Sequence, residues 1–223
     1  SPSRRQRQMC IRDSDYIEQA AGDSTLYASL DGFWEGNNVG TRNVKVVTGE
    51  LPGNGDGEIL VGAHHDSVYI SPGAVDNAVG VSQLLEVAAQ MSDLELESTV
   101  TFATWGGEEL GLLGSQAYIK NNPDKMDNLD LYINLDSTNL NPEEGLGTLG
   151  IESSNQNLLD SISDIQSTVM DNKKWDDYDA TVQLNELQGN SDHRSFNQHG
   201  ITTIGFYGWQ YDEYHRQTDV PSV

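Results

Sequence analysis

The chain has 223 residues, a length that suits one domain with a sizeable hydrophobic core. It carries 35 acidic and 12 basic side chains, which gives a formal net charge of -23 at pH 7. Because nucleic acids and anionic membranes are also negatively charged, this balance argues against both as partners and favours cations, either metal ions or the ammonium group of a peptide.

Residues 1–14, SPSRRQRQMCIRDS, differ in composition from the rest of the chain. They contain four arginines, one acid and the only cysteine, Cys10, and they lack the apolar core of a signal peptide. We expect a non-native or disordered tail there and one domain over residues 15–223. Since this domain has no cysteine, disulfides and thiolate metal sites are excluded, and a metal would need His and carboxylate ligands. No apolar run approaches the ~18 residues of a membrane-spanning helix.

Short β-rich runs alternate with helical patterns along the chain, which is typical of the α/β class. The patterns predict strands at 44–49, 58–65, 99–105, 129–137, 179–186 and 201–208. They predict helices at 77–91, 110–122, 155–170 and 191–200. In such sheets ligands bind beyond the carboxyl ends of the strands. The acids and histidines that fall there are His64, Asp66, Glu108, Glu109 and Asp136.

The segment GAHHDS ends the second predicted strand. Residues two apart on a strand share a face, so His64 and Asp66 project together while His65 points away. A carboxylate beside an imidazole fixes its tautomer and makes the free nitrogen a better metal ligand. A polar strand end with a structural histidine is the alternative.

The adjacent glutamates in WGGEELGLLGS raise the question of why two carboxylates stand side by side. A helix start favours negative charge by roughly 0.3–1 kcal/mol, which accounts for one glutamate better than for two. A hydrolytic metal site gives each a separate role, since one binds the metal and the other accepts a proton from water. Asp76 could equally cap a helix, Asp136 could be a turn acid, and His215 a surface histidine.

The order of these segments is more specific than any one of them. HxD, GAVDNAxG, WGGEELGLLGS, NLD and YHxxxD, in this order, resemble the M28 family of zinc peptidases over nearly all of residues 43–219. The resemblance implies a three-layer α/β/α sandwich around a central mixed, mostly parallel sheet. It also implies two Zn²⁺ ions and hydrolysis of peptide substrates from their N-terminus by an aminopeptidase.

The resemblance further implies roles for individual residues. His64, Asp76 and Asp136 would bind one zinc, and Asp76, Glu109 and His215 the other. Three further residues would assist: Glu108 as the general base, Asp66 as the partner that orients His64, and Tyr214 as a group that stabilises the tetrahedral intermediate.

The segment GNSDHRSFNQHG resembles a family segment near the substrate pocket. We expect Ser191 or Asp192 to cap a short helix, His193 to be structural, and His199 to lie at the surface near that helix's C-terminus.

Three alternative functions stay open at this point. They are a single-zinc glutaminyl cyclase, a carboxypeptidase of the same family, and a non-catalytic interaction domain with a peptidase-like fold. The family domain usually closes with a helix after YHxxxD, and we expect that helix to be missing after Val223. The family and the acidity imply a secreted, extracellular or periplasmic protein, without membrane insertion and with an unknown oligomeric state.

Overall fold

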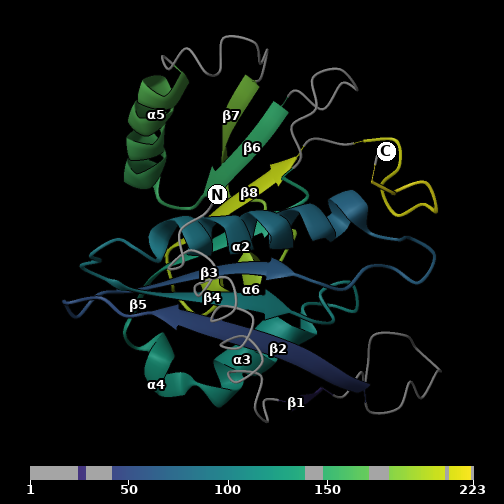
Figure 1. Ribbon diagram of the computed structural model, residues 1–223, viewed down its shortest axis with the longest axis horizontal. Helices are drawn as coiled ribbons and strands as arrows, with labels where there is room; N and C mark the ends of the chain where they lie inside the picture. The colour runs from purple at the N-terminus through teal and green to yellow at the C-terminus, as the bar shows by residue number, and fades with distance from the viewer. Residues whose placement is uncertain (1–24, 29–41, 139–147, 171–180, 209–210, 222–223) are drawn as a thin grey trace, which may run out of the picture.

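The computed structural model describes residues 25–28, 42–138, 148–170, 181–208 and 211–221. These residues form one mixed sheet with helices on both of its faces (Figure 1). This arrangement confirms the predicted three-layer α/β/α fold. The expected tail at residues 1–14 lies outside the described part of the chain.

The sheet is mixed and mostly parallel. Its strands in the described residues are β1 (Thr25–Ala28), β2 (Arg42–Leu51), β3 (Glu58–His64), β4 (Thr99–Trp105), β5 (Leu129–Asp136), β6 (Thr148–Ser153), β7 (Thr181–Glu186) and β8 (Thr203–Gly208). They lie in the order β1-β2-β4-β3-β5-β8-β6-β7. The pairs β3–β4, β3–β5, β5–β8 and β6–β7 are parallel, whereas β1–β2, β2–β4 and β6–β8 are antiparallel. The sequence patterns did not predict β1 or β6.

The helical elements are η1 (Ala74–Ala78), α2 (Val79–Met91), α3 (Leu113–Asn121), α4 (Pro123–Met126), α5 (Gln156–Met170) and α6 (His193–Asn197). Two of them differ from the predictions in a way that matters for the site. A separate turn, η1, precedes α2 and carries Asp76. Helix α3 begins at Leu113, three residues later than the predicted start at 110, so a longer turn carries Glu108 and Glu109 ahead of it.

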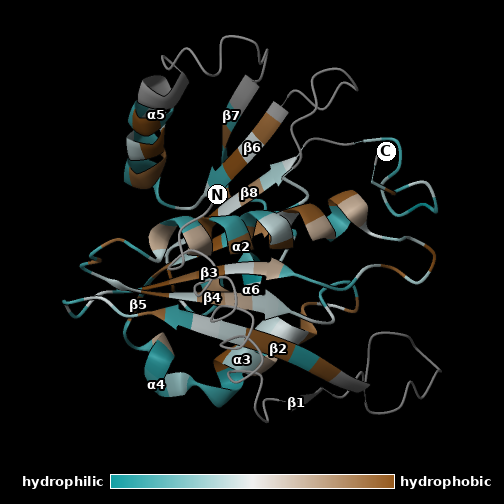
Figure 2. Cartoon of the chain, in the orientation of Figure 1, coloured by the Kyte–Doolittle hydropathy of each residue, from teal (hydrophilic) through white to brown (hydrophobic). Residues whose placement is uncertain are grey.

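Alternation along the central strands fills two hydrophobic layers. Leu60 of β3 is buried against α3 and α6 with Trp105, Tyr132 and Phe196. The next residue, Val61, points to the other face and packs in the cluster that includes Leu84 of α2. Figure 2 shows hydrophobic residues along β3 and alternating hydrophobic and hydrophilic bands along α5. Within the described residues no helix is both long and apolar enough to cross a membrane.

Parallel neighbours bring the candidate residues to one edge of the sheet. In the register of β3 with β4, His64 pairs with Trp105, and the strand β5 ends at Asp136. The chain therefore leaves β3, β4 and β5 at the same edge, where the segments carrying Asp66 and Glu108 begin.

Candidate metal centre

One group of ligand-type side chains gathers around His64 at the end of β3. Its Nε2 lies 3.1 Å from Oδ1 of Asp76 and 3.3 Å from Oδ1 of Asp136. The three ligand atoms all lie within 4.8 Å of one another, and His64 and Asp76 are buried. This arrangement of one imidazole and two carboxylates suits a divalent cation such as zinc.

A second group shares Asp76 with the first. Nε2 of His215 lies 3.1 Å from Oδ2 of Asp76 and 3.1 Å from Oε2 of Glu109. Asp76 thus directs one carboxylate oxygen to each group. The two groups are adjacent, and Asp76 lies between them.

The polar atoms of the second group are arranged as ligands of a cation rather than as hydrogen-bond partners of one another. Nε2 of His215 and Oε1 of Glu109 are buried and have no hydrogen-bond partner. The imidazole lies close to two carboxylate oxygens without the geometry to donate to either, which is how ligands around a shared ion are arranged. Buried polar atoms without partners are costly, and a bound cation would satisfy both of them.

The electrostatics of the cluster also favour a positive ion. Burial, followed by the negative charge of Asp76, raises the pKa of Glu109 to about 7. Burial lowers the pKa of His64, but hydrogen bonds to Asp136 and Asp76 outweigh it and raise the pKa well above its ordinary value. The carboxylates therefore repel one another and attract protons, and a divalent cation would offset that repulsion.

Asp76 is held in place by a segment far along the chain. The carboxylate of Asp219, which is buried, accepts hydrogen bonds from the main-chain N–H of Val75 at 2.8 Å and of Asp76 at 3.2 Å. Its main-chain carbonyl also accepts a hydrogen bond from the N–H of Ala74. These bonds fasten η1 to the segment that carries His215.

Glu108 belongs to neither ligand group, although it is adjacent in the sequence to Glu109 of the second group. Burial raises the pKa of Glu108 to about 9, which keeps its carboxyl ready to hold a proton. The carboxylate of Asp66 accepts hydrogen bonds from the N–H groups of Glu108 at 3.1 Å and Glu109 at 3.3 Å. Asp66 therefore orients the glutamate turn.

The expected contact between Asp66 and His64 takes a different form. The group that lies 3.0 Å from Nδ1 of His64 is the main-chain carbonyl of Asp66, while its carboxylate is 3.8 Å away. Asp66 therefore contacts His64 mainly through its main-chain carbonyl, while its carboxylate also accepts the glutamate N–H groups. His65 is exposed and belongs to neither group.

Tyr214 stands at the rim beside His215. The two rings stack with their centroids 3.8 Å apart, and Tyr214 is 51% exposed. Burial of part of the ring and the negative charges of Asp76 and Glu109 raise the pKa of its hydroxyl. The phenol thus stays protonated and is a hydrogen-bond donor at the edge of the cluster.

The expectation of a side-chain cap on α6 was wrong. Asp192 precedes the helix, but it makes no capping hydrogen bond and accepts one from the hydroxyl of Ser115 at 2.5 Å. The hydroxyl of Ser191 accepts a hydrogen bond from Asn134. His193 forms a buried pair with Glu152, and His199 is exposed beyond the end of the helix.

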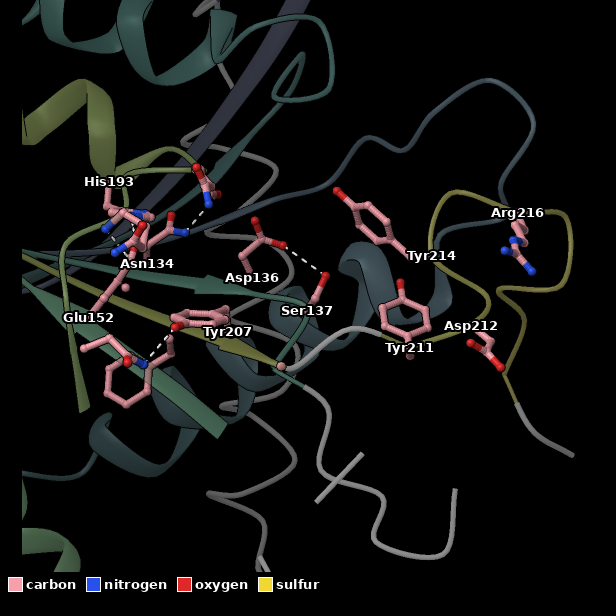
Figure 3. Close-up of a pocket in the computed structure, with 17 residues that line it drawn as sticks. Asn134, Asp136, Ser137, Glu152, His193, Tyr207, Tyr211, Asp212, Tyr214 and Arg216 are labelled. Atoms are coloured by element: carbon pink, nitrogen blue, oxygen red, sulfur yellow. Dashed lines mark hydrogen bonds and ion pairs between the residues drawn. The ribbon is translucent and has the colours of Figure 1, made fainter. Parts of the chain in front are cut away.

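A cavity of about 940 Å³ opens beside the first group (Figure 3). Asp136 and Tyr214 line it together with residues of β6, β7 and β8. In this view Asp136 lies between the Glu152–His193 side of the cavity and the rings of Tyr211 and Tyr214. Glu152 carried no sequence signal because β6 was not predicted.

Comparison with known proteins identifies the family of this chain. The sequence model of peptidase family M28 matches residues 46–222. The chain belongs to peptidase family M28. Its match includes both groups of candidate ligands, the glutamate turn and Asp66.

Several relatives of this M28 chain are aminopeptidases by name. An aminopeptidase from Pseudomonas aeruginosa is 38% identical over 97 residues, which cover 43% of this chain and 18% of the relative. A probable lipoprotein aminopeptidase from Mycobacterium tuberculosis is 32% identical over 174 residues, covering 74% of this chain and 34% of the relative. The chain therefore spans about a third or less of the length of these two relatives.

A solved structure with a similar fold is BSAP, a zinc aminopeptidase from Bacillus subtilis. It aligns with a TM-score of 0.67 and 25% sequence identity, covering 80% of this chain and 44% of BSAP.

Proposed function

We propose that this M28 chain carries the catalytic site of an aminopeptidase that uses two zinc ions. The observation that carries the proposal is the pair of adjacent ligand groups that share Asp76, with Glu108 next to a ligand of the second group. His64, Asp76 and Asp136 would hold one ion, and Asp76, Glu109 and His215 the other. Two groups with a shared carboxylate favour this function over a single-zinc glutaminyl cyclase or a domain without metal.

Zinc at such a site polarises a peptide carbonyl and lowers the pKa of water. The residues of the chain supply the remaining functions. Glu108 accepts a proton from water at its carboxylate and returns it to the leaving amine. Asp66 holds the turn that presents this carboxylate. Tyr214 donates a hydrogen bond from its hydroxyl to the oxyanion that develops on the attacked carbonyl.

The proposed substrate is a peptide with a free N-terminus. Its ammonium group would be attracted by the carboxylates of the two groups and by the acidic chain as a whole. A carboxypeptidase would instead need a cationic group to bind the substrate carboxylate. The cavity beside Asp136 contains one arginine, Arg216, which could do so. The carboxylates of Asp212 and Glu152 in the same lining would oppose binding of a substrate carboxylate.

A screen of aminoacyl 4-nitroanilides with zinc-loaded and chelator-treated protein tests the proposal. We expect hydrolysis that is abolished by chelator and restored by zinc, with two zinc ions per chain by elemental analysis. Acetylated substrates should not be cleaved. Hydrolysis of C-terminal residues instead, one zinc per chain, or activity unaffected by chelator would contradict the proposal.

An extracellular or periplasmic location is also proposed. The name of the mycobacterial relative, a probable lipoprotein, supports it. Fractionation of the source cells followed by immunoblotting tests this location, and detection only in the cytoplasm would contradict it.

A further inference from the structure

Most of the described residues that line the cavity beside Asp136 have polar side chains, alongside the aromatic rings of Phe206, Tyr207, Tyr211 and Tyr214. Of the described residues around it, Phe206 alone has a wholly apolar side chain, while Asn185, Gln188 and Asn190 contribute amides. The cavity adjoins a candidate metal ligand, so a substrate whose carbonyl lies at the metal groups would direct its N-terminal side chain here. A leucine side chain would displace water from these amides without replacing its hydrogen bonds, which is unfavourable.

Two residues of the wall offer a matched donor and acceptor. The side-chain N–H of Asn185 donates a hydrogen bond to the hydroxyl oxygen of Tyr207 at 3.0 Å. The Tyr207 proton has no acceptor among the described residues, and burial raises the pKa of this phenol, so it remains a donor. The side-chain oxygen of Asn185 likewise has no donor among them and remains an acceptor.

A primary carboxamide complements this pair, since its oxygen accepts from Tyr207 while its N–H₂ donates to Asn185. We propose that this cavity selects an N-terminal residue with a neutral carboxamide side chain, glutamine above all. This inference rests on the proposed function. The cavity, at about 940 Å³, has ample room for the longer side chain.

Acidic side chains are disfavoured by the carboxylates that the cavity already contains, and the most buried of these carboxylates is already hydrogen-bonded. The carboxylate of Glu152 is 2% exposed and accepts hydrogen bonds from His193 at 2.5 Å, Gln188 at 2.8 Å and Gly189 at 3.1 Å. Three donors already bind it, so it offers a substrate lysine or arginine few further hydrogen bonds. A substrate glutamate or aspartate would meet the negative charges of Glu152, Asp136 and Asp212.

The test compares kcat/KM for glutaminyl, leucyl, lysyl and glutamyl 4-nitroanilides with the zinc-loaded chain. We expect the glutaminyl substrate to be preferred over the leucyl one by about 10-fold or more, the effect of two hydrogen bonds. Tyr207→Phe should remove most of this preference by slowing only the glutaminyl substrate, and Asn185→Leu should reverse it. Gln183→Leu, an exposed position on the same strand outside the cavity, is the matched control and should leave the ratio unchanged.

Calorimetric binding of free L-glutamine and L-leucine to the same proteins separates this inference from the proposed function. Tighter binding of glutamine that Tyr207→Phe abolishes supports the inference even if no substrate is cleaved, in which case only the proposed function fails. Cleavage with a preference for leucine overturns the inference and leaves the proposed function standing. Absence of both binding and cleavage overturns both.

Discussion

One oxygen of the Asp66 carboxylate accepts a hydrogen bond from the main-chain N–H of Glu108 at 3.1 Å. The other oxygen accepts from the N–H of Glu109 at 3.3 Å, so a single side chain sets the direction of both glutamates. Asp66 and Glu108 lie 42 positions apart in the sequence, at the ends of neighbouring parallel strands. The consequence is that Asp66 controls the geometry of the glutamate turn without entering either ligand group.

Asp66→Asn should therefore damage the site while leaving every ligand in place. The amide presents one oxygen and one N–H₂ group, so one of the two glutamate N–H groups would face a donor. We expect zinc affinity or turnover to fall by roughly 10–100-fold. Competition with a chromophoric chelator measures the affinity. Asp93→Asn, at an exposed position outside both groups, is the control, and equal behaviour of the two variants would refute this role.

The adjacent glutamates should respond differently to the same substitution. Glu108→Gln should retain zinc and lose roughly 10²–10⁴-fold in kcat, because the amide cannot accept a proton from water. Glu109→Gln should lose zinc affinity as well, because a neutral amide oxygen is a weaker ligand than a carboxylate. Metal analysis and steady-state kinetics on both proteins decide the matter. Equal metal loss in the two variants would be incompatible with separate roles.

The paired histidines offer a test with an internal control. His64→Ala should abolish zinc binding at the first group, because His64 lies 3.1–3.3 Å from both carboxylates there. His65→Ala should leave zinc content unchanged, since His65 is exposed and outside both groups. Zinc titration followed by elemental analysis distinguishes the two. An essential His65 would mean that the strand register at this edge differs by one residue.

Asp192 should make the stability of the metal-free chain depend on pH. Burial raises its pKa from 3.8 to about 7, so the folded chain holds the proton where the unfolded chain has released it. Stability is thus lost as pH rises from about 4 to about 7, by up to about 4 kcal/mol. Asp192→Asn keeps the acceptor for Ser115 and removes this titration.

The difference in melting temperature between Asp192→Asn and the native chain should therefore increase over that pH range and level off above it. Differential scanning calorimetry in the presence of chelator measures it. A constant difference from pH 4 to 8 would show that Asp192 does not titrate in this range.

The candidate residues that the structure brings together could be singled out from the sequence because each falls at a strand end or in a short segment with a distinct composition. His64 and Asp136 each close a strand with a clear apolar pattern, so strand periodicity alone located them. Family resemblance was needed to divide the ligands into two groups. Neither source could show that Asp66 turns to the glutamate N–H groups, since that depends on how two separate strands are placed side by side.

The wrong predictions share one cause, which is contact between residues that are far apart in the sequence. Asp192 looked like a helix cap, but its oxygen is taken by Ser115, 77 positions earlier. Strand β6, with the sequence TLGIES, was missed because glycine within a short run reads as a turn. A Cβ at Gly150 would overlap the ring of Tyr207 on the adjacent strand, so the glycine is required by packing that no local pattern reveals.

The bonds from Asp219 to Val75 and Asp76 determine when the site can exist during synthesis. A ribosome makes the segment with the shared ligand long before it makes the residue that fastens that segment. A nascent chain that has reached residue 200 contains most of the fold but lacks His215 and the fastening carboxylate. Assembly of the two ligand groups therefore waits until the segment that carries His215 and Asp219 has been synthesised and has packed against η1.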